Sequence, residues 1–241
     1  MENHGNSARY GYHVPHLLVA GFVGGAAIAT VGLLLLLARQ APWILAALAI
    51  VVGLGLLVLT AGLGWLVYRG RPLITERMLD TVPWTGGERV LDVGCGPGLS
   101  LIAAAKRLTT GKAIGIDKWA VIHGETHNSR AITLKNAHLE GVEDRIEVHD
   151  GDAGAMPFAD ATFDVVVSSF VFHHLDREAQ TKALSEITRV TRPGGRILIT
   201  DDRTDRLASE LRALGLQEVE NRRVVFPIHL LSARKANVLS T

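Results

Sequence analysis

The sequence predicts an α/β domain built on a seven-stranded, mostly parallel sheet and preceded by two transmembrane α-helices. Two observations lead to this fold class. Residues 17–68 form two long apolar runs, whereas from residue 89 onward short runs rich in valine and isoleucine alternate with helical stretches. Such alternation is typical of a parallel sheet that is covered by helices on both faces.

The two apolar runs, residues 17–38 and 43–68, contain no charged residue. As helices they would extend roughly 33 and 39 Å, enough to cross a hydrocarbon core of about 30 Å, the second one with a tilt. Only four residues separate them, so we expect a tight antiparallel hairpin whose second helix Pro42 opens at its first turn. A cleaved signal peptide is the alternative for the first run, but the second span follows almost at once.

Glycines recur within both spans. They would let the two helix backbones approach closely, they could equally mediate a homo-oligomer, or they could reflect the ordinary frequency of glycine in membrane helices. The glycines concerned are Gly21, Gly25, Gly53, Gly55, Gly62 and Gly64.

Basic residues set the expected orientation of the spans. Arg9 precedes the first span, Arg69, Arg71 and Arg77 follow the second, and the connecting loop holds only Arg39. The positive-inside rule therefore predicts an integral membrane protein with both termini and the whole region after the second span in the cytoplasm.

Charge and cysteine content narrow the partners. The formal net charge is +1, which gives no global field to attract nucleic acid. The single cysteine, Cys95, excludes an internal disulfide and suits a reducing compartment. We therefore divide the chain into an N-terminal segment (1–16), a helical hairpin (17–70) that contacts the bilayer, and a soluble domain (71–241).

The soluble domain reads as strands and helices in alternation. Its last two strands are separated only by Pro227, so we expect them to form an antiparallel hairpin. The expected strands are residues 89–93, 112–116, 145–149, 163–168, 196–200, 218–226 and 228–233. The expected helices are residues 73–82, 99–108, 121–139, 178–190 and 205–214, and residues 193–195 are expected to turn into the fifth strand.

The first strand runs directly into a loop with glycine at every second position, Val-Leu-Asp-Val-Gly-Cys-Gly-Pro-Gly over residues 90–98. Glycines there let the backbone turn sharply and lie against a flat ligand. The spacing is G-x-G-x-G and differs from the G-x-G-x-x-G of dinucleotide folds. Cys95 suits this loop as a small residue in a crowded turn.

Polar side chains follow the next strands at the point where each one ends. Asp117 ends the second strand, Asp152 follows the third and Ser168 ends the fourth. The carboxyl ends of parallel strands are where open α/β sheets bind ligands, so the four strand ends predict one binding edge.

In these motifs the sequence resembles the class I S-adenosylmethionine-dependent methyltransferases of the small type 11 group. The resemblance covers residues 73–236 and rests on VLDVGCGPG, GID, GDAGAMPF, FDVVVSSFVFHHL and RPGGRILI. It implies a Rossmann-like, doubly wound sheet and S-adenosylmethionine as the cofactor.

The resemblance also implies roles for individual residues. The backbone of the loop, Gly94, Cys95, Gly96, Pro97 and Gly98, would lie against the methionine part of the cofactor. Asp92 would be near that part, Asp117 would hold the ribose hydroxyls, and Lys118 or Trp119 would flank the adenine. Asp152 and the backbone of Ala153 would read the adenine edge, and Ser168 with its neighbours would offer carbonyls to the ammonium group.

A general base is needed only if the acceptor must lose a proton. The candidates are His173 and His174 after the fourth strand, which we favour as catalytic, and Asp201 and Asp202 after the fifth. A capping or packing role for the two histidines stays open. His123 and His127 share a helix face, but no third ligand is apparent, so we expect no metal site.

Three functions remain to be compared. The first is a membrane-anchored methyltransferase with a lipophilic small-molecule acceptor, which we expect from the nearby spans alone. The second is a membrane-tethered methyltransferase for a soluble small molecule or a protein. The third is a non-enzymatic scaffold that binds the cofactor.

Overall fold

The computed structural model describes residues 8, 10, 16–39, 42–65, 70–119 and 128–237. The chain divides into two compact units. The smaller one spans residues 12–73 and contains α1 (His16–Ala38) and α2 (Trp43–Trp65). The larger one contains residues 74–241 and takes in Tyr10 from the N-terminal segment.

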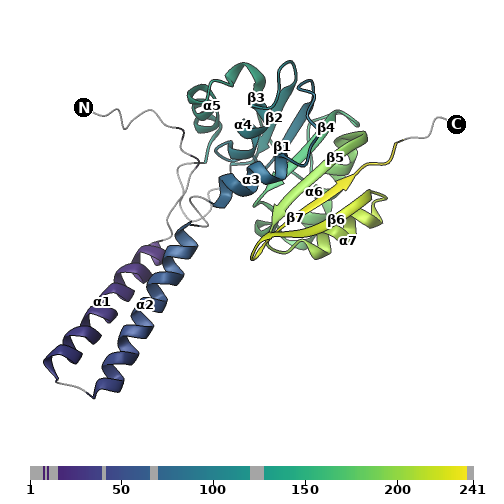
Figure 1. Ribbon diagram of the computed structural model, residues 1–241. Helices are drawn as coiled ribbons and strands as arrows, with labels where there is room; N and C mark the ends of the chain where they lie inside the picture. The colour runs from purple at the N-terminus through teal and green to yellow at the C-terminus, as the bar shows by residue number, and fades with distance from the viewer. Residues whose placement is uncertain are drawn as a thin grey trace. The chain divides into compact units, whose positions relative to one another are not determined.

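Helices α1 and α2 form the antiparallel hairpin that the sequence predicts (Figure 1). Both are long and apolar enough to cross a membrane, judged by length and composition. Most of their large apolar side chains are exposed. Pro42 lies one residue before α2, and its carbonyl accepts hydrogen bonds from the amides of Leu45 (2.9 Å) and Ala46 (3.3 Å). Pro42 therefore caps the helix and is not part of its first turn. Residues 66–68 of the expected span lie outside the described residues.

Glycine makes the close contact between α1 and α2 possible. A Cβ on Gly53 would lie 2.5 Å from the amide nitrogen of Ala29 and 2.6 Å from the carbonyl oxygen of Gly25. A Cβ on Gly55 would meet nothing within 4 Å. The expected close approach of the two backbones is thus confirmed at Gly25 and Gly53, which lie in the seam, the line of contact between α1 and α2. Gly55 faces away from this seam.

This difference supplies a matched pair of variants. Gly53→Ala should push the two helices apart and destabilise the hairpin by about 1–3 kcal/mol, because the new methyl group has no free volume. Gly55→Ala should leave the hairpin unchanged or slightly more stable, since alanine favours the helix. Amide hydrogen exchange of α1 and α2 in detergent would compare them, and equal exchange in both variants would contradict the seam.

The larger unit is built on one sheet with the strand order β3-β2-β1-β4-β5-β7-β6. The first five strands of this order, β3, β2, β1, β4 and β5, pair in parallel. Strand β7 pairs antiparallel with both β5 and β6. The strands are β1 (Arg89–Val93), β2 (Lys112–Asp117), β3 (Ile146–Asp150), β4 (Phe163–Ser169), β5 (Thr191–Asp201), β6 (Gln217–Val225) and β7 (Ile228–Arg234). The predicted sheet with its C-terminal antiparallel hairpin is therefore confirmed.

Helices cover both faces of this sheet (Figure 1). Buried side chains of α3 and α4 pack with those on one face, and α6 and α7 pack on the opposite face. The helices are α3 (Arg71–Leu79), α4 (Leu99–Ala105), α5 (Arg130–Leu139), α6 (Arg177–Val190) and α7 (Asp205–Ala213), with 3-10 turns η2 (Glu143–Arg145) and η3 (Phe172–His174).

Two expected boundaries are wrong. The helix predicted over residues 121–139 begins at Arg130, because Ser129 is extended and its side chain accepts a hydrogen bond from the amide of Ile132. Residues 120–127, and with them His123 and His127, lie outside the described residues. Strand β5 begins at Thr191, where we expected a turn over residues 193–195, because Thr191 already pairs with Phe163 before a register shift.

Candidate functional site

The loop after β1 turns through three left-handed glycines. Gly94, Gly96 and Gly98 have φ angles of +74°, +49° and +94°, a region that side chains with a Cβ rarely adopt. A Cβ on Gly94 would also collide with the side chain of Val171. The amides of Gly94 and Cys95 donate to the carbonyl of Ile116 on β2, at 2.8 and 3.2 Å. The loop is thus anchored to the neighbouring strand, and its three glycines carry no side chain that would keep a ligand away from the backbone.

Asp92 lies beneath this loop as a buried and incompletely satisfied carboxylate. Its side chain is 1% exposed, and within the described residues its Oδ2 has no hydrogen-bond partner. Burial, together with the negative charge of Asp117, raises the pKa of Asp92 to about 7, although the backbone amide of Leu101 acts in the opposite direction. A carboxylate in this position would gain much from a nearby cation.

Asp117 holds the loop from the end of β2. Its Oδ2 accepts the amide of Gly96 at 2.9 Å, and its Oδ1 accepts the amide of Trp119 at 2.7 Å. Two buried residues of α5 hold the loop from the other side: Thr133 donates to the Gly96 carbonyl (2.6 Å) and Asn136 to the Pro97 carbonyl (2.9 Å). Sequence reasoning missed both, although they are polar positions three residues apart on one face of a predicted helix.

The hydrogen bond from Thr133 can be tested without touching the ligand. Thr133→Val keeps the shape but removes a bond of about 1 kcal/mol, so S-adenosylmethionine should bind about fivefold more weakly. Thr188→Val is the control, because the Thr188 hydroxyl donates to the carbonyl of Leu184 within its own helix, α6. Calorimetric titration would compare the two, and equal affinities would show that this bond does not shape the loop.

Beyond Asp117 lies a polar and aromatic corner at the ends of β2 and β3. The indole nitrogen of Trp119 donates to Asp150 at 2.6 Å, and Lys118 lies 3.5 Å from the carboxylate of Asp152. Asp152 also accepts the amide of Gly154 at 2.7 Å. That hydrogen bond, with the charge of Lys118, lowers the pKa of Asp152. Ala153 follows in the same turn, half-buried against the core.

Hydroxyl groups join the ends of β4 and β5. Ser168 is buried and donates to the carbonyl of Val93 at 2.9 Å, just before the glycine loop. Next to it, Ser169 Oγ lies 3.1 Å from Ser100 Oγ on α4 and 3.0 Å from Thr200 Oγ1 on β5. This chain ties β4 to both neighbours, and of its members only Ser168 is among the predicted site residues.

Cys95 is buried and turned into the protein. Its sulfur would be 2.8 Å from a Cβ on Gly115, so it fills the space that this glycine leaves open on β2. Burial, with the charges of Asp92 and Asp117, raises the pKa of the thiol. The side chain therefore has the small, packing role expected for a crowded turn, and its backbone remains part of the loop.

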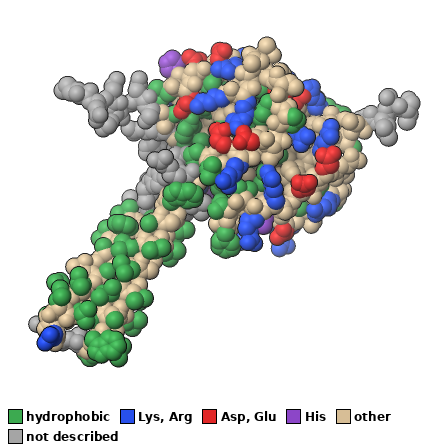
Figure 2. Space-filling view, viewed as in Figure 1, with side chains coloured by type: hydrophobic (Ala, Val, Ile, Leu, Met, Phe, Trp, Pro, Cys, Tyr) green, Lys and Arg blue, Asp and Glu red, His purple; other side chains and the backbone are tan. Residues whose placement is uncertain are grey.

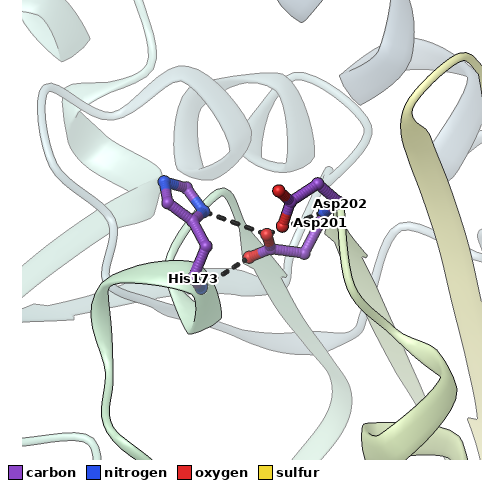
Figure 3. Close-up of side chains that lie close together, drawn as sticks. All are labelled: His173, Asp201 and Asp202. Carbon is purple, nitrogen blue, oxygen red and sulfur yellow. Dashed lines mark hydrogen bonds and ion pairs between the residues drawn. The ribbon is translucent and has the colours of Figure 1, made fainter.

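His173 and Asp201 form a dyad at the ends of β4 and β5 (Figure 3). The Nδ1 of His173 lies 2.9 Å from Asp201 Oδ1, and the His173 amide donates to Asp201 Oδ2 at 3.3 Å. Burial alone would raise the pKa of Asp201, but the hydrogen bond and charge of His173 and the amide of Asp202 bring it below its usual value. The rings of His173 and His174 have centroids 3.8 Å apart.

The same three residues meet a weak geometric condition for a metal site. Ligand atoms of His173, Asp201 and Asp202 all lie within 4.8 Å of one another. However, Asp201 already uses both of its oxygens for the dyad and backbone amides. The arrangement thus resembles a histidine oriented by a carboxylate, which is the usual partnership of a general base.

These groups line up along one edge of the sheet in strand order. Asp152 lies beyond β3, Asp117 at β2, the glycine loop at β1, Ser168 at β4 and Asp201 at β5. The point where the order reverses, between β1 and β4, is where open α/β sheets bind ligands. Acceptors for a ribose at one end and an unpaired buried carboxylate near the middle fit a nucleoside that carries positive charge, as S-adenosylmethionine does.

Comparison with known proteins points the same way. Residues 90–195 match a family model described as a methyltransferase domain. The ubiquinone/menaquinone biosynthesis C-methyltransferase UbiE of Roseobacter denitrificans is 34% identical over 126 residues, which cover 52% of this chain and 47% of that protein. The 27-O-demethylrifamycin SV methyltransferase of Amycolatopsis mediterranei is 34% identical over 132 residues, covering 53% and 43%. The chain thus spans less than half the length of either relative.

The fold has a counterpart among solved structures. A crystal structure of a SAM-dependent methyltransferase from Aquifex aeolicus superposes with a TM-score of 0.55 at 23% identity, covering 66% of this chain and 88% of that one. Residues 90–195 therefore resemble a methyltransferase domain in sequence, and the unit that contains them has the fold of that S-adenosylmethionine-dependent methyltransferase.

Proposed function

We propose that this chain is a membrane-anchored, S-adenosylmethionine-dependent methyltransferase whose acceptor is a lipophilic small molecule. The observation that carries the enzymatic part is Asp92, a buried carboxylate with an unpaired oxygen. It lies directly before the glycine loop, within the residues that match the methyltransferase family model. Burying such a group without a partner is costly, and a cationic ligand offsets that cost.

Each residue of the edge has a task in binding. S-adenosylmethionine, when bound, supplies a methyl group on a positively charged sulfur, which is already an activated leaving group. Ionised Asp92 would balance positive charge near the loop. Asp117 would accept hydrogen bonds from ribose hydroxyls, Trp119 would flank the adenine, and Asp152 would accept from its amino group.

The dyad would serve an acceptor that must lose a proton. Asp201 fixes Nδ1 of His173, so the other ring nitrogen, Nε2, points away from the carboxylate (Figure 3). Nε2 would accept the proton from the acceptor's oxygen, nitrogen or activated carbon as that atom forms its bond to the methyl carbon. The charge left on the imidazole would be balanced by Asp201.

Two features support membrane anchoring and a lipophilic acceptor. The hairpin exposes mostly apolar side chains around both helices. Proteins in water rarely expose a contiguous apolar surface of this size. The relatives named above include, by their names, a methyltransferase of quinone biosynthesis and one that acts on a rifamycin. Arginines precede the first span and follow the second, whereas the connecting loop has only Arg39. We therefore infer that both termini and the methyltransferase domain are cytoplasmic.

The test is a labelled-methyl screen with the full chain in proteoliposomes. S-adenosylmethionine with a radioactive methyl group is offered with a membrane extract or with the soluble fraction of the same cells. We expect label in an organic-extractable product from the membrane extract, and none with an Asp117→Ala variant. Label confined to soluble molecules or to protein would overturn the lipophilic acceptor. Failure to bind S-adenosylmethionine would refute both methyltransferase functions, whereas binding without transfer of label would favour the non-enzymatic scaffold.

A further inference from the structure

The turn between β6 and β7 exposes an aromatic side chain. Phe226 is 76% exposed, whereas the other exposed large apolar side chains described from residue 74 onward, Leu134 and Leu214, are 40% and 41% exposed. Leaving a phenyl ring in water forfeits its hydrophobic stabilisation. A contact with something outside the larger unit would recover it.

One arginine lies beside this ring, and two others lie near the turn in the sequence or in the strand register. The guanidinium of Arg223 lies 5.8 Å from the centroid of Phe226, and the exposed Arg222 precedes it on β6. Across the described residues, no ion pair is found for Arg222 or Arg223. Arg203, which is 92% exposed, approaches only Asp202, at 3.9 Å. Figure 2 shows hydrophobic and basic side chains together at the end of the larger unit where β6 turns into β7.

The strand register places this turn beside the candidate active site. Val225 pairs with Ile228, and His229 pairs with Asp201, the carboxylate of the dyad. The turn therefore lies at the same edge of the sheet as the glycine loop and His173. A surface that binds Phe226 would therefore lie at the same edge of the sheet as the dyad.

We propose that Phe226, Arg222, Arg223 and Arg203, together called the hairpin tip, dock on the headgroup region of an anionic bilayer. An aromatic ring that settles at the interface, with arginines that reach phosphate groups, is a combination that suits this partner. The proposal rests on the proposed function insofar as α1 and α2 hold the chain in the same bilayer. That tether keeps the tip at high local concentration near the lipid, which a second copy or a soluble partner would lack.

An environment-sensitive dye at position 226 tests the docking. Cys95 is buried, so in the full chain a Phe226→Cys variant can be labelled selectively, and Leu214→Cys, at the C-cap of α7, provides the control. Both are placed at low protein density in vesicles of phosphatidylcholine and phosphatidylglycerol, with or without brominated acyl chains. We expect a blue shift and bromine quenching at position 226 and neither at position 214.

Charge variants of the labelled protein separate docking from insertion caused by the dye. Arg222→Gln or Arg223→Gln should shift the equilibrium toward the undocked state by about fivefold each, the effect of one arginine near an anionic surface. Lys135→Gln, an exposed charge on α5, should change nothing. Equal dye signals at positions 226 and 214, insensitivity to both arginines, or a signal that grows with protein density would overturn the proposal.

Calorimetry with S-adenosylmethionine on the same vesicles keeps the two proposals apart. Ligand binding with a water-exposed tip would refute the docking and leave the methyltransferase standing. A buried tip without ligand binding would support the docking while refuting the enzymatic function.

Discussion

Replacing Asp92 with asparagine should make the ligand-free protein more stable at pH 8 while weakening its binding of S-adenosylmethionine. The carboxyl group is fully buried and its pKa is raised to about 7. Below pH of about 4 it is protonated in both the folded and the unfolded chain and has no effect. As pH rises from there to about 7, the unfolded chain releases the proton and the folded chain keeps it, so stability falls through this window.

The size of this effect follows from the width of the window. Each pH unit is worth about 1.4 kcal/mol, so the ionised carboxylate destabilises the folded state by about 4 kcal/mol at pH 8. The variant avoids this cost, but its buried amide has no partner, which destabilises the folded state by about 1–3 kcal/mol and offsets part of the gain. We therefore expect a higher midpoint of thermal unfolding for Asp92→Asn at pH 8, and a difference that shrinks as the pH falls and reverses in favour of the parent near pH 4.

Ligand binding should change in the opposite sense. Loss of a charged partner costs about 1.5–3 kcal/mol, so the variant should bind S-adenosylmethionine about 10- to 100-fold more weakly. Binding to the unmodified protein should tighten as pH rises through 7. Asp160→Asn is the control, because that carboxylate is exposed and precedes the start of β4, at the edge of the sheet opposite the loop. A variant that is less stable than the parent at pH 8 and binds equally well would contradict this role for Asp92.

Removing the imidazole of His173 should abolish most of the methyl transfer and spare cofactor binding. A positioned general base contributes about 10²- to 10⁴-fold, so His173→Ala should lose that much in kcat at an unchanged dissociation constant for S-adenosylmethionine. Asp201→Asn should lose part of it, because His173 keeps its ring but loses the carboxylate that orients Nδ1. Label transfer into the membrane extract and calorimetry would give the two quantities.

His174 is the matched comparison for that experiment. It lies next to His173 in the 3-10 turn, with its ring centroid 3.8 Å from that of His173, yet the carboxylate of Asp201 binds the His173 ring. We expect His174→Ala to retain activity within about tenfold of the parent, well short of the loss of a general base. A full rate in His173→Ala would mean that alignment of the acceptor suffices and that no base operates.

Much of the fold can be predicted because the residues within each strand and turn are themselves typical of that structure. The valine-rich runs fix the strands, and the glycines after β1 fix the first turn, since positive φ angles favour residues without a Cβ. The start of α5 is less evident. The sequence before Ser129 is also predicted to be helical. The start of α5 is set by a single N-cap hydroxyl, that of Ser129, which accepts a hydrogen bond from the amide of Ile132.

The partners of the loop could not be read from the chain alone. Thr133 and Asn136 reach the carbonyls of Gly96 and Pro97 from residues 37 and 39 positions away. The sequence places His173 and Asp201 at two different strand ends as separate base candidates. Their pairing depends on β4 lying next to β5, with Ser169 opposite Thr200, which is a property of the strand order.

The most direct test is a calorimetric titration of S-adenosylmethionine into the full chain, compared with Asp117→Ala and Asp160→Ala. This edge of the sheet should bind one cofactor per chain, and Asp117→Ala should lose affinity because the ribose acceptor and the amide contacts of Gly96 and Trp119 disappear together. Asp160→Ala should bind as the parent does. Absence of binding in the parent, or equal binding in both variants, would contradict the assignment of this edge of the sheet as the cofactor site.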